Sequence, residues 1–474
     1  MNHWTMKISA RVFCVALSSC AVHAPASAQT ALPDAPSGHL VAFDGVPQNP
    51  TASEQAAASS SSASGNQPKL TRTDAEQMAI KNNPRIKVSR LLALAQHQVV
   101  RESRAALLPT ATANVTAVDA ENGSRISAGN LTASRLFEHA GAGGGFTQLI
   151  TDFGRTNNLI ASSKLQEKAQ DANAVATEQD ILIATDQAFY NALEAQALDQ
   201  VAKQNVETRG ATDSQVSQLT KNKLKSTLDL SFADVNLSQA KLLLLDADNN
   251  LHATMAALDE VLGLDHEVVY DLADDAQNAQ SPPPDVDDLV QQGLQQRPDL
   301  QSLTLDQQAA VKYSRAERDQ MLPSISAAGT AGSVPVRPAQ YYLTNWWGGI
   351  GVNLNIPVFN GFLYSAQAKE ASLRAQADAE KTRDLRDSIV RDIHTAWLAA
   401  NTAYQRVSVT QELLNQANQA LKLAQARYQM GLSSIVELSQ AQYQQTDAAI
   451  SNTNAQYQYE FALATLNYQM GSTP

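Results

Sequence analysis

Two long stretches without glycine or proline constrain the fold of this chain most strongly. They run from Arg155 to Arg209 and from Phe362 to Met430, and both are rich in Ala, Gln, Leu and Glu, which favour helix. An unbroken helix over the longer stretch would extend roughly 100 Å at about 1.5 Å per residue. Its apolar residues follow coiled-coil steps of four and three: Ile393, Trp397, Ala400, Tyr404 and Val407, then Leu414, Ala417, Leu421, Ala424 and Tyr428. We therefore predict long coiled-coil helices in an extended body.

The chain also repeats itself at a nearly constant offset. Asn82-Asn83-Pro84 recurs as Gln296-Arg297-Pro298, and Leu262-Gly263 recurs as Met470-Gly471. Such self-similarity indicates a duplicated unit. We predict four segments: a signal peptide at 1–28, a disordered Ala/Ser/Pro-rich linker at 29–69, a first repeat at 70–280 and a second repeat at 281–474.

Each repeat is expected to contain a helix that ends at a Leu-Pro step, then a pair of strands, then long helices. The strand pairs are predicted at 109–120 and 142–152 in the first repeat, and at 323–334 and 347–358 in the second. The alternation from Gly349 to Ile356 is typical of a wall with one lipid face and one polar face. Aromatic residues near this strand predict a membrane-interface girdle, with a packed loop as the alternative: Tyr341, Tyr342, Trp346 and Trp347.

The N-terminal segment has the pattern of an export signal. Lys7 and Arg11 precede an apolar stretch, and Ala26-Ser27-Ala28 suits cleavage by signal peptidase. The segment also fits a lipoprotein box, in which Cys20 would be lipidated, and the sequence leaves this alternative open. Because Cys14 and Cys20 both lie in this leader, we expect neither disulfides nor cysteine metal sites after cleavage.

Charge and hydropathy narrow the function classes. The chain has 35 basic and 47 acidic residues and a net charge of −12, which argues against a nucleic-acid partner. After the leader, no stretch approaches the ~18 apolar residues that a membrane helix needs, so a membrane crossing would use strands. Closed membrane barrels begin at about eight strands, so four strands per chain require oligomers. Two copies would supply eight strands around a bore filled by side chains, and three copies would supply twelve with room for a passage, which favours three or more subunits without choosing among them.

Several segments resemble one known family. They are Thr73 to Pro84, Leu107-Leu108-Pro109, Gly351 to Gly361 and Ala426 to Leu438, and in this order they resemble TolC-family outer-membrane efflux proteins over about residues 70 to 471. The resemblance implies a mainly α fold with a membrane β part. It implies antiparallel coiled-coil helices in an α-barrel and a homotrimeric 12-stranded β-barrel in the outer membrane. It also implies two partners, a periplasmic adaptor (membrane fusion protein) and an inner-membrane pump of the resistance-nodulation-division or ABC type.

The resemblance also implies functional positions in the periplasmic part. Two helical tips would dock the adaptor, and their residues are Gly431, Leu432 and Ser433 in the second repeat and Lys223 and Lys225 in the first. Glu437 matches the first of two acids that ring the family's aperture, Gln440 stands at the place of the second, and Asp229 is the counterpart of Glu437 in the first repeat. Gln440 puts strong cation selectivity in doubt. Without the resemblance, Glu437 would be interpreted as a solvated helix residue.

Enzymatic function finds no support in the sequence. The glycine run Gly141 to Gly145 lacks the lysine and hydroxyl residue of a phosphate-binding loop, and the histidines form no metal-ligand pair. We therefore predict no catalytic, metal or cofactor residues and a passive channel for small molecules such as drugs, toxic compounds or metals. A duct for type I protein or peptide secretion is the alternative, and a structural coiled-coil envelope protein is a third hypothesis.

Overall fold

The computed structural model describes residues 69–118, 125–128, 131–135, 139–266, 268, 270–273, 281–333 and 346–472. The predicted signal peptide, nearly all of the predicted linker, the lipidation candidate Cys20 and the aromatic residues Tyr341 and Tyr342 lie outside these residues.

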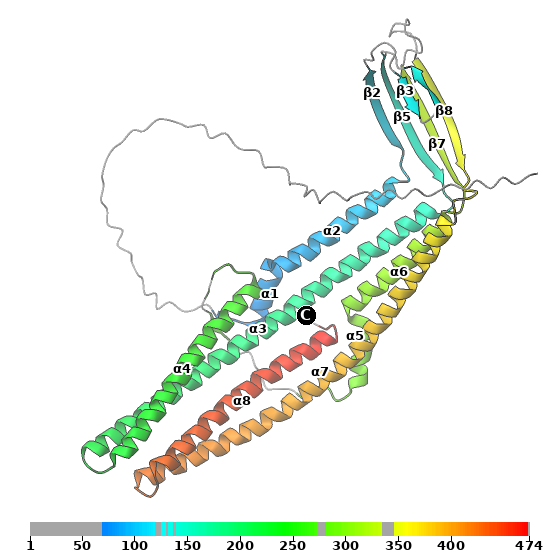
Figure 1. Cartoon of the computed structure of the whole chain (residues 1–474). Helices are drawn as coiled ribbons and strands as arrows, with labels where there is room; N and C mark the ends of the chain where they lie inside the picture. The colour runs from blue at the N-terminus through cyan, green and yellow to red at the C-terminus, as the bar shows by residue number, and fades with distance from the viewer. Residues whose placement is uncertain are drawn as a thin grey trace, which may run out of the picture. The chain divides into compact units, whose positions relative to one another are not determined.

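The element order of the first half of the structure recurs in the second (Figure 1). The first half contains β1 (Lys69–Leu70), α1 (Arg72–Asn82), α2 (Pro84–Ala105), β2 (Thr110–Val118), β3 (Arg125–Ala128), β4 (Leu131–Arg135), β5 (His139–Thr151), α3 (Arg155–Lys221), α4 (Thr227–Leu262) and β6 (Asp271–Leu272). The second contains α5 (Val286–Gln296), α6 (Pro298–Asp319), β7 (Ser324–Ser333), β8 (Trp346–Asn355), α7 (Leu363–Gln429) and α8 (Ile435–Gln469). Two helices, two main strands and a hairpin of two long helices thus occur twice.

Each repeat opens with two helices where the sequence predicted one. Pro84 begins α2 and Pro298 begins α6, each as the first helical residue, because proline lacks the amide hydrogen that this position does not need. The residue before each proline is extended and ends the preceding helix. These second helices end at Ala105 and Asp319, ahead of the Leu-Pro steps that were expected to end them.

The long helices match the glycine-free and proline-free stretches, with one difference. Helix α7 spans almost the whole predicted stretch, whereas α3 continues past Arg209 and through Gly210 to Lys221. A glycine inside a helix costs only about 1 kcal/mol, and packing of α3 against α4 offsets this cost. A Cβ atom added at Gly210 would lie 3.9 Å from Cδ1 of Leu237 in α4, an ordinary contact distance.

The helices pack side by side, and α3 is central because it contacts α2, α4, α6 and α8. Toward the sheet, the packing order is α2, α3, α6 and α7, and toward the hairpin ends it is α4, α3, α8 and α7. Two apolar clusters lie near the middle of the layer, around Phe189 and Leu258 in the first repeat and around Ile393 and Leu466 in the second. A third cluster joins the ends of the two hairpins around Val216, Tyr428 and Leu438.

The strands form a four-stranded antiparallel sheet of order β2-β5-β7-β8. The observed bounds differ from the predicted ones by a few residues at the ends. The sequence analysis did not predict the small separate hairpin of β3 and β4, which is inserted between β2 and β5. Among the described helices, none is both long enough and apolar enough to cross a membrane. The predicted fold class, long coiled-coil helices with a four-stranded β part, is confirmed.

Candidate functional site

The two hairpin tips have the same backbone geometry. At the end of α7, Gly431 has φ of 75° and the amide of Leu432 donates to the carbonyl of Arg427 at 2.8 Å. At the end of α3, Lys223 has φ of 61° and the amide of Leu224 donates to the carbonyl of Leu219 at 2.8 Å. This is a helix C-terminus closed by a left-handed residue, which is normally glycine. We call the tip between α3 and α4 the first tip and the tip between α7 and α8 the second tip. The first tip therefore has a lysine, Lys223, in a conformation that costs about 1–2 kcal/mol.

A serine begins the second helix of each hairpin, and an acid follows three residues later. Ser226 Oγ accepts from the amide of Asp229 at 3.2 Å, and Ser434 Oγ accepts from the amide of Glu437 at 3.3 Å. The pattern of Ser and Glu three residues apart is an N-capping signature, and an acid in the first turn also suits the helix dipole. Asp229 and Glu437 thus have a local stabilising role in addition to any role in a channel.

The predicted aperture and docking residues fall into two groups. Glu437 forms an ion pair with Arg427 at 3.0 Å across the second tip, and both side chains are about half exposed. Lys225 of the first tip places its ammonium 4.4 Å from the ring centroid of Tyr428, within cation–π range. Burial, together with the negative charge of Asp229, raises the pKa of Tyr428. Asp229 therefore acts on a tyrosine of the other hairpin, whereas Glu437 pairs within its own hairpin.

Polar contacts also join the two hairpins above the tips. Asn236 Nδ2 of α4 donates to Ser439 Oγ of α8 at 2.7 Å. Arg209 of α3 is buried and donates from Nη1 to Gln442 Oε1 of α8 at 2.8 Å and from Nε to Asn205 Oδ1 at 3.3 Å. Burial lowers the pKa of Arg209. A guanidinium held by neutral amides fixes the spacing of α3 and α8 without a matching charge.

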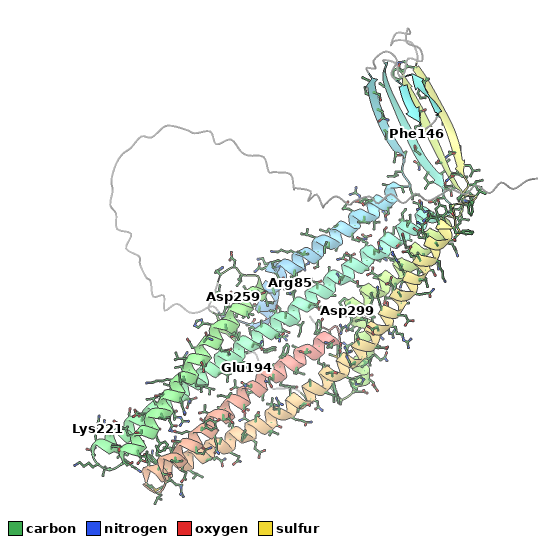
Figure 2. The ribbon with its side chains drawn as sticks, in the orientation of Figure 1. Arg85, Phe146, Glu194, Lys221, Asp259 and Asp299 are labelled. Atoms are coloured by element: carbon green, nitrogen blue, oxygen red, sulfur yellow. The ribbon has the colours of Figure 1, made fainter. Side chains whose placement is uncertain are left out.

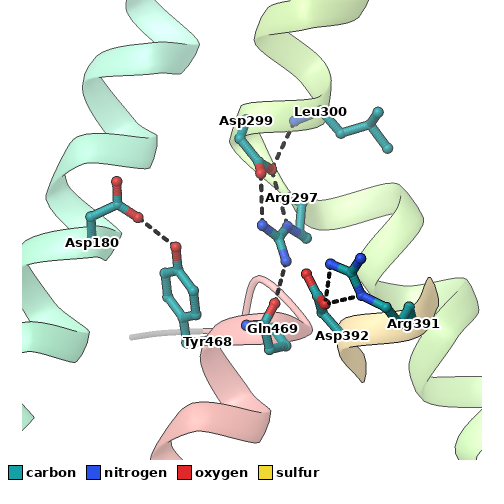
Figure 3. A network of polar contacts seen from close by, with 8 residues as sticks. All are labelled: Asp180, Arg297, Asp299, Leu300, Arg391, Asp392, Tyr468 and Gln469. Atoms are coloured by element: carbon teal, nitrogen blue, oxygen red, sulfur yellow. Dashed lines mark hydrogen bonds and ion pairs between the residues drawn. The ribbon is translucent and has the colours of Figure 1, made fainter. Parts of the chain in front are cut away.

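The opposite end of α8 is held by a second polar network (Figure 3). Arg297, at the start of α6, makes a bidentate ion pair with Asp299 and donates to Gln469 Oε1 near the end of α8. The adjacent Tyr468 donates its hydroxyl hydrogen to Asp180 of α3. Charged partners strengthen such bonds. The C-terminal end of α8 is thus fixed near the middle of the helical layer, and its N-terminal end forms the second tip. Figure 2 labels Lys221, which ends α3 at the first tip.

The register of the sheet separates an apolar face from a polar face. Val115 of β2, Phe146 of β5 and Ile350 of β8 belong to the apolar face, and Phe146 lies over Gly329 of the neighbouring strand. Successive residues of a strand point to opposite faces. Trp346 therefore belongs to the apolar face, as a girdle residue would, and Trp347 belongs to the polar face.

Within the described residues, the sheet and the helical layer each end in an element that has a neighbour on one side only. Strands β2 and β8 each pair on one side only in the described sheet. At the edge formed by α4, Leu228, Val235 and Leu242 repeat every seven residues and are exposed by 54% to 63%. At the edge formed by α7, Val409 and Leu423 are exposed by 66% and 67%. Unpaired strand edges and exposed apolar stripes are surfaces at which a further chain commonly binds.

The same order of elements has a known family counterpart. The model of the family described as outer membrane efflux protein matches residues 75–264 and 289–472. The chain belongs to the outer membrane efflux protein family. It is therefore an outer-membrane protein, and its role is that of an efflux channel.

Individual relatives agree with this family. The outer membrane protein TolC of Escherichia coli is 23% identical over 83% of this chain and 82% of its own length. TolC of Vibrio cholerae is 25% identical over 80% of this chain and 85% of its own length. A crystal structure of CusC superposes with a TM-score of 0.75 at 18% identity, covering 85% of this chain and 92% of that chain. The Campylobacter jejuni channel CmeC superposes with a TM-score of 0.73 at 18% identity and 85% coverage of both chains.

Some members of the site were missed by the sequence interpretation. The Ser-x-x-Asp and Ser-x-x-Glu patterns at Ser226 and Ser434 could have predicted the two helix caps of this efflux protein. Arg427 could have been found as an opposite charge one turn before the tip. By contrast, Arg209 and Gln442 are 233 residues apart, and their contact is visible only in the fold.

Proposed function

We propose that this chain is one subunit of a homotrimeric passive channel in a tripartite efflux system. The channel would carry small molecules such as drugs, toxic compounds or metals from an inner-membrane pump and a periplasmic adaptor to the outside, and it would catalyse no reaction itself. The observation that carries this proposal is the pair of open edges. Three copies joined edge to edge would bring twelve strands into one closed barrel, which leaves no strand edge facing lipid.

The helical edges support the same ring. A cyclic assembly uses two different surfaces of each subunit, so the surface at one edge must complement that at the other. The α4 stripe of Leu228, Val235 and Leu242 offers apolar side chains at heptad spacing, and the face of α7 with Leu398, Val409 and Leu423 offers the same kind of surface. Packing the α4 edge of one copy against the α7 edge of the next would remove both stripes from water, with the coiled-coil packing that the spacing favours.

The tips are the proposed adaptor-docking residues: Gly431, Leu432 and Ser433 in one hairpin and Lys223 and Lys225 in the other. Leu432 is 65% exposed at the end of its hairpin, so a partner surface that covered it would remove apolar area from water. Lys221 and Lys223 are exposed at the other tip, so an adaptor with acidic residues at the matching position would fit. The tip between α7 and α8 therefore offers an apolar contact, and the tip between α3 and α4 offers lysines beside the exposed Leu224.

The proposed aperture is formed by Glu437 and Gln440 of α8, with Asp229 as the counterpart of Glu437 in the other hairpin. Glu437 and Gln440 are exposed and lie one turn apart, so they share a face of the helix. Arg427 neutralises part of the Glu437 charge, and Gln440 is uncharged. We therefore expect weaker cation selectivity than two unpaired acids per subunit would give.

Crosslinked co-purification from detergent-solubilised envelopes tests the proposal. A C-terminal tag and mass spectrometry would identify partners, and native mass spectrometry would give the number of copies. We expect three copies together with an adaptor and a proton-driven pump. An ATP-driven transporter as the partner would favour the secretion alternative. A chain that remains alone, or forms a complex other than a trimer, under several crosslinking conditions would refute the channel assembly.

A further inference from the structure

On the polar face of the sheet, one row of four aligned residues has no side chain at its two central positions. The register aligns Asn114 of β2, Gly143 of β5, Gly332 of β7 and Trp347 of β8 directly across the four strands. Two glycines thus separate an amide side chain from an indole ring. At about 4.8 Å between strands, the distance from β2 to β8 is roughly 14 Å.

The packing of β5 against β7 prevents a side chain at Gly332, so the floor of this row is formed by backbone atoms. A Cβ atom at Gly332 would lie 2.9 Å from the carbonyl oxygen of Ala142 and 2.9 Å from Cα of Gly143. Both neighbours are backbone atoms, so a larger residue at Gly332 would push the two strands apart. The close approach of β5 and β7 therefore keeps side chains out of this position, and the backbone itself forms the floor.

A cavity of about 390 Å³ lies over this floor, and its size suits a small organic molecule. The described residues that line it include Thr112, Asn114, Gly143, Thr330 and Trp347. Trp347 is 51% exposed, so much of its ring is free to contact a molecule in the cavity. Hydroxyl and amide groups supply hydrogen-bond donors and acceptors at the opposite side.

None of the described residues that line this cavity has a charged side chain, because all of them are threonine, asparagine, glycine, alanine or tryptophan. Among these lining residues, no charge pair is available to discriminate between molecules. The electron-rich face of Trp347 is the group that remains able to select a molecule, and it attracts flat aromatic rings and cations.

We propose that the cavity between Asn114 and Trp347 is a transient binding site for planar aromatic cargo, with preference for aromatic cations. The ring of the cargo would stack on Trp347 above the glycine floor, and its polar edge would meet Asn114 and the threonines. This inference rests on the proposed channel, because the polar face of the sheet is the lumen only if the strands close into a barrel.

Binding of ethidium, a planar aromatic cation, to the full-length protein in nanodiscs tests the proposal. The dissociation constant would be measured by fluorescence anisotropy for the wild type, Trp347→Ala, Trp347→Phe and Trp346→Ala. We expect Trp347→Ala to weaken binding by about 5- to 30-fold, the range of one stacking or cation–π contact, and Trp347→Phe to lie between. Trp346→Ala is the matched control, since it removes the same ring from the opposite face one residue away, and it should leave binding unchanged.

Equal ethidium binding in the wild type and Trp347→Ala would overturn the inference, as would equal losses in Trp346→Ala and Trp347→Ala. Tetrapropylammonium, a cation without a ring, should compete poorly, and strong competition would show a site for charge alone and overturn the aromatic preference. Conductance of the wild type in planar bilayers separates the two proposals. A conducting trimer whose ethidium binding ignores Trp347 refutes only the cargo site, whereas a protein that forms no pore refutes the channel and the inference with it.

Discussion

The two repeats place a glycine at the same joint, and substitution there should be costly for a reason that the structure defines. Gly263 follows α4 with φ of 72°, and a Cβ atom on it would lie 3.0 to 3.1 Å from the backbone carbonyl of Asn82 and the amide of Asn83. Gly263→Ala therefore adds two costs, a left-handed alanine and a methyl group against a backbone that a proline-capped helix holds in place.

The magnitude follows from these two costs. A left-handed alanine costs about 1–2 kcal/mol, and forcing a methyl group into a filled space costs about 1–3 kcal/mol. Gly263→Ala should therefore destabilise by roughly 2–5 kcal/mol. Gly431 has nearly the same φ, 75°, but no atom within 4 Å of its Cβ position, so Gly431→Ala should cost only about 1–2 kcal/mol.

The assay compares chemical unfolding of the two variants and the wild type in detergent, followed by circular dichroism at 222 nm under matched conditions. Gly471→Ala is a third variant, since its Cβ would lie 3.0 Å from the backbone of Gln296 and Arg297, and it should resemble Gly263→Ala. Equal destabilisation by Gly263→Ala and Gly431→Ala would refute the reasoning, because the backbone contact would then contribute nothing.

Two further predictions concern charge. Burial raises the pKa of Asp186, which pairs with Arg72 at 3.7 Å, to about 7. Between about pH 4 and pH 7 the folded state keeps a proton that the unfolded state releases, so the free energy of unfolding of the wild type falls as the pH rises. Asp186→Asn lacks this titration, so its free energy of unfolding should increase by roughly 1–4 kcal/mol relative to the wild type over that range. A difference in melting temperature between the two proteins that does not change with pH would contradict this. Glu437→Ala should raise bilayer conductance by about 1.4- to 5-fold, the factor that corresponds to the loss of one exposed ion pair, because the pair with Arg427 holds the start of α8 against α7 in the hairpin that we propose to line the aperture. Unchanged conductance, or an equal rise in the control Asp447→Ala, would remove Glu437 from the aperture.

The helices were predictable because one rule decides most of them. A stretch without glycine or proline set the bounds of α7 to within one residue. The same rule predicted that α3 ends at Arg209, which is too early. The free-energy cost of Gly210 inside the helix is smaller than the stabilisation that α3 gains by packing beyond it. The breaks before Pro84 and Pro298 were present in the sequence and could have been interpreted as helix starts.

The sheet and the tips show where sequence reasoning stops. Alternation predicted two different faces, and applied to Trp346 and Trp347 it would have placed the two rings on opposite sides. The β3–β4 hairpin is short, four and five residues per strand, and lacks a strong apolar pattern. The position of Lys225 over Tyr428 and of Arg209 beside Gln442 depends on how two distant hairpins pack, and no local pattern carries that information.

The fixed end of α8 makes the helix a lever. It has 35 residues, so it is ~52 Å long, and its C-terminal end is anchored through Tyr468 and Gln469 while Ile435 begins the other end. A rotation of about 5° around the anchored end would move the Ile435 end by roughly 4–5 Å without bending the helix. A displacement of molecular size at the tip therefore requires hardly any strain at the anchor. The resistance to such a rotation therefore comes from the other half of α8, where the apolar cluster around Val216, Tyr428 and Leu438 and the bonds from Arg209 and Asn236 would have to separate.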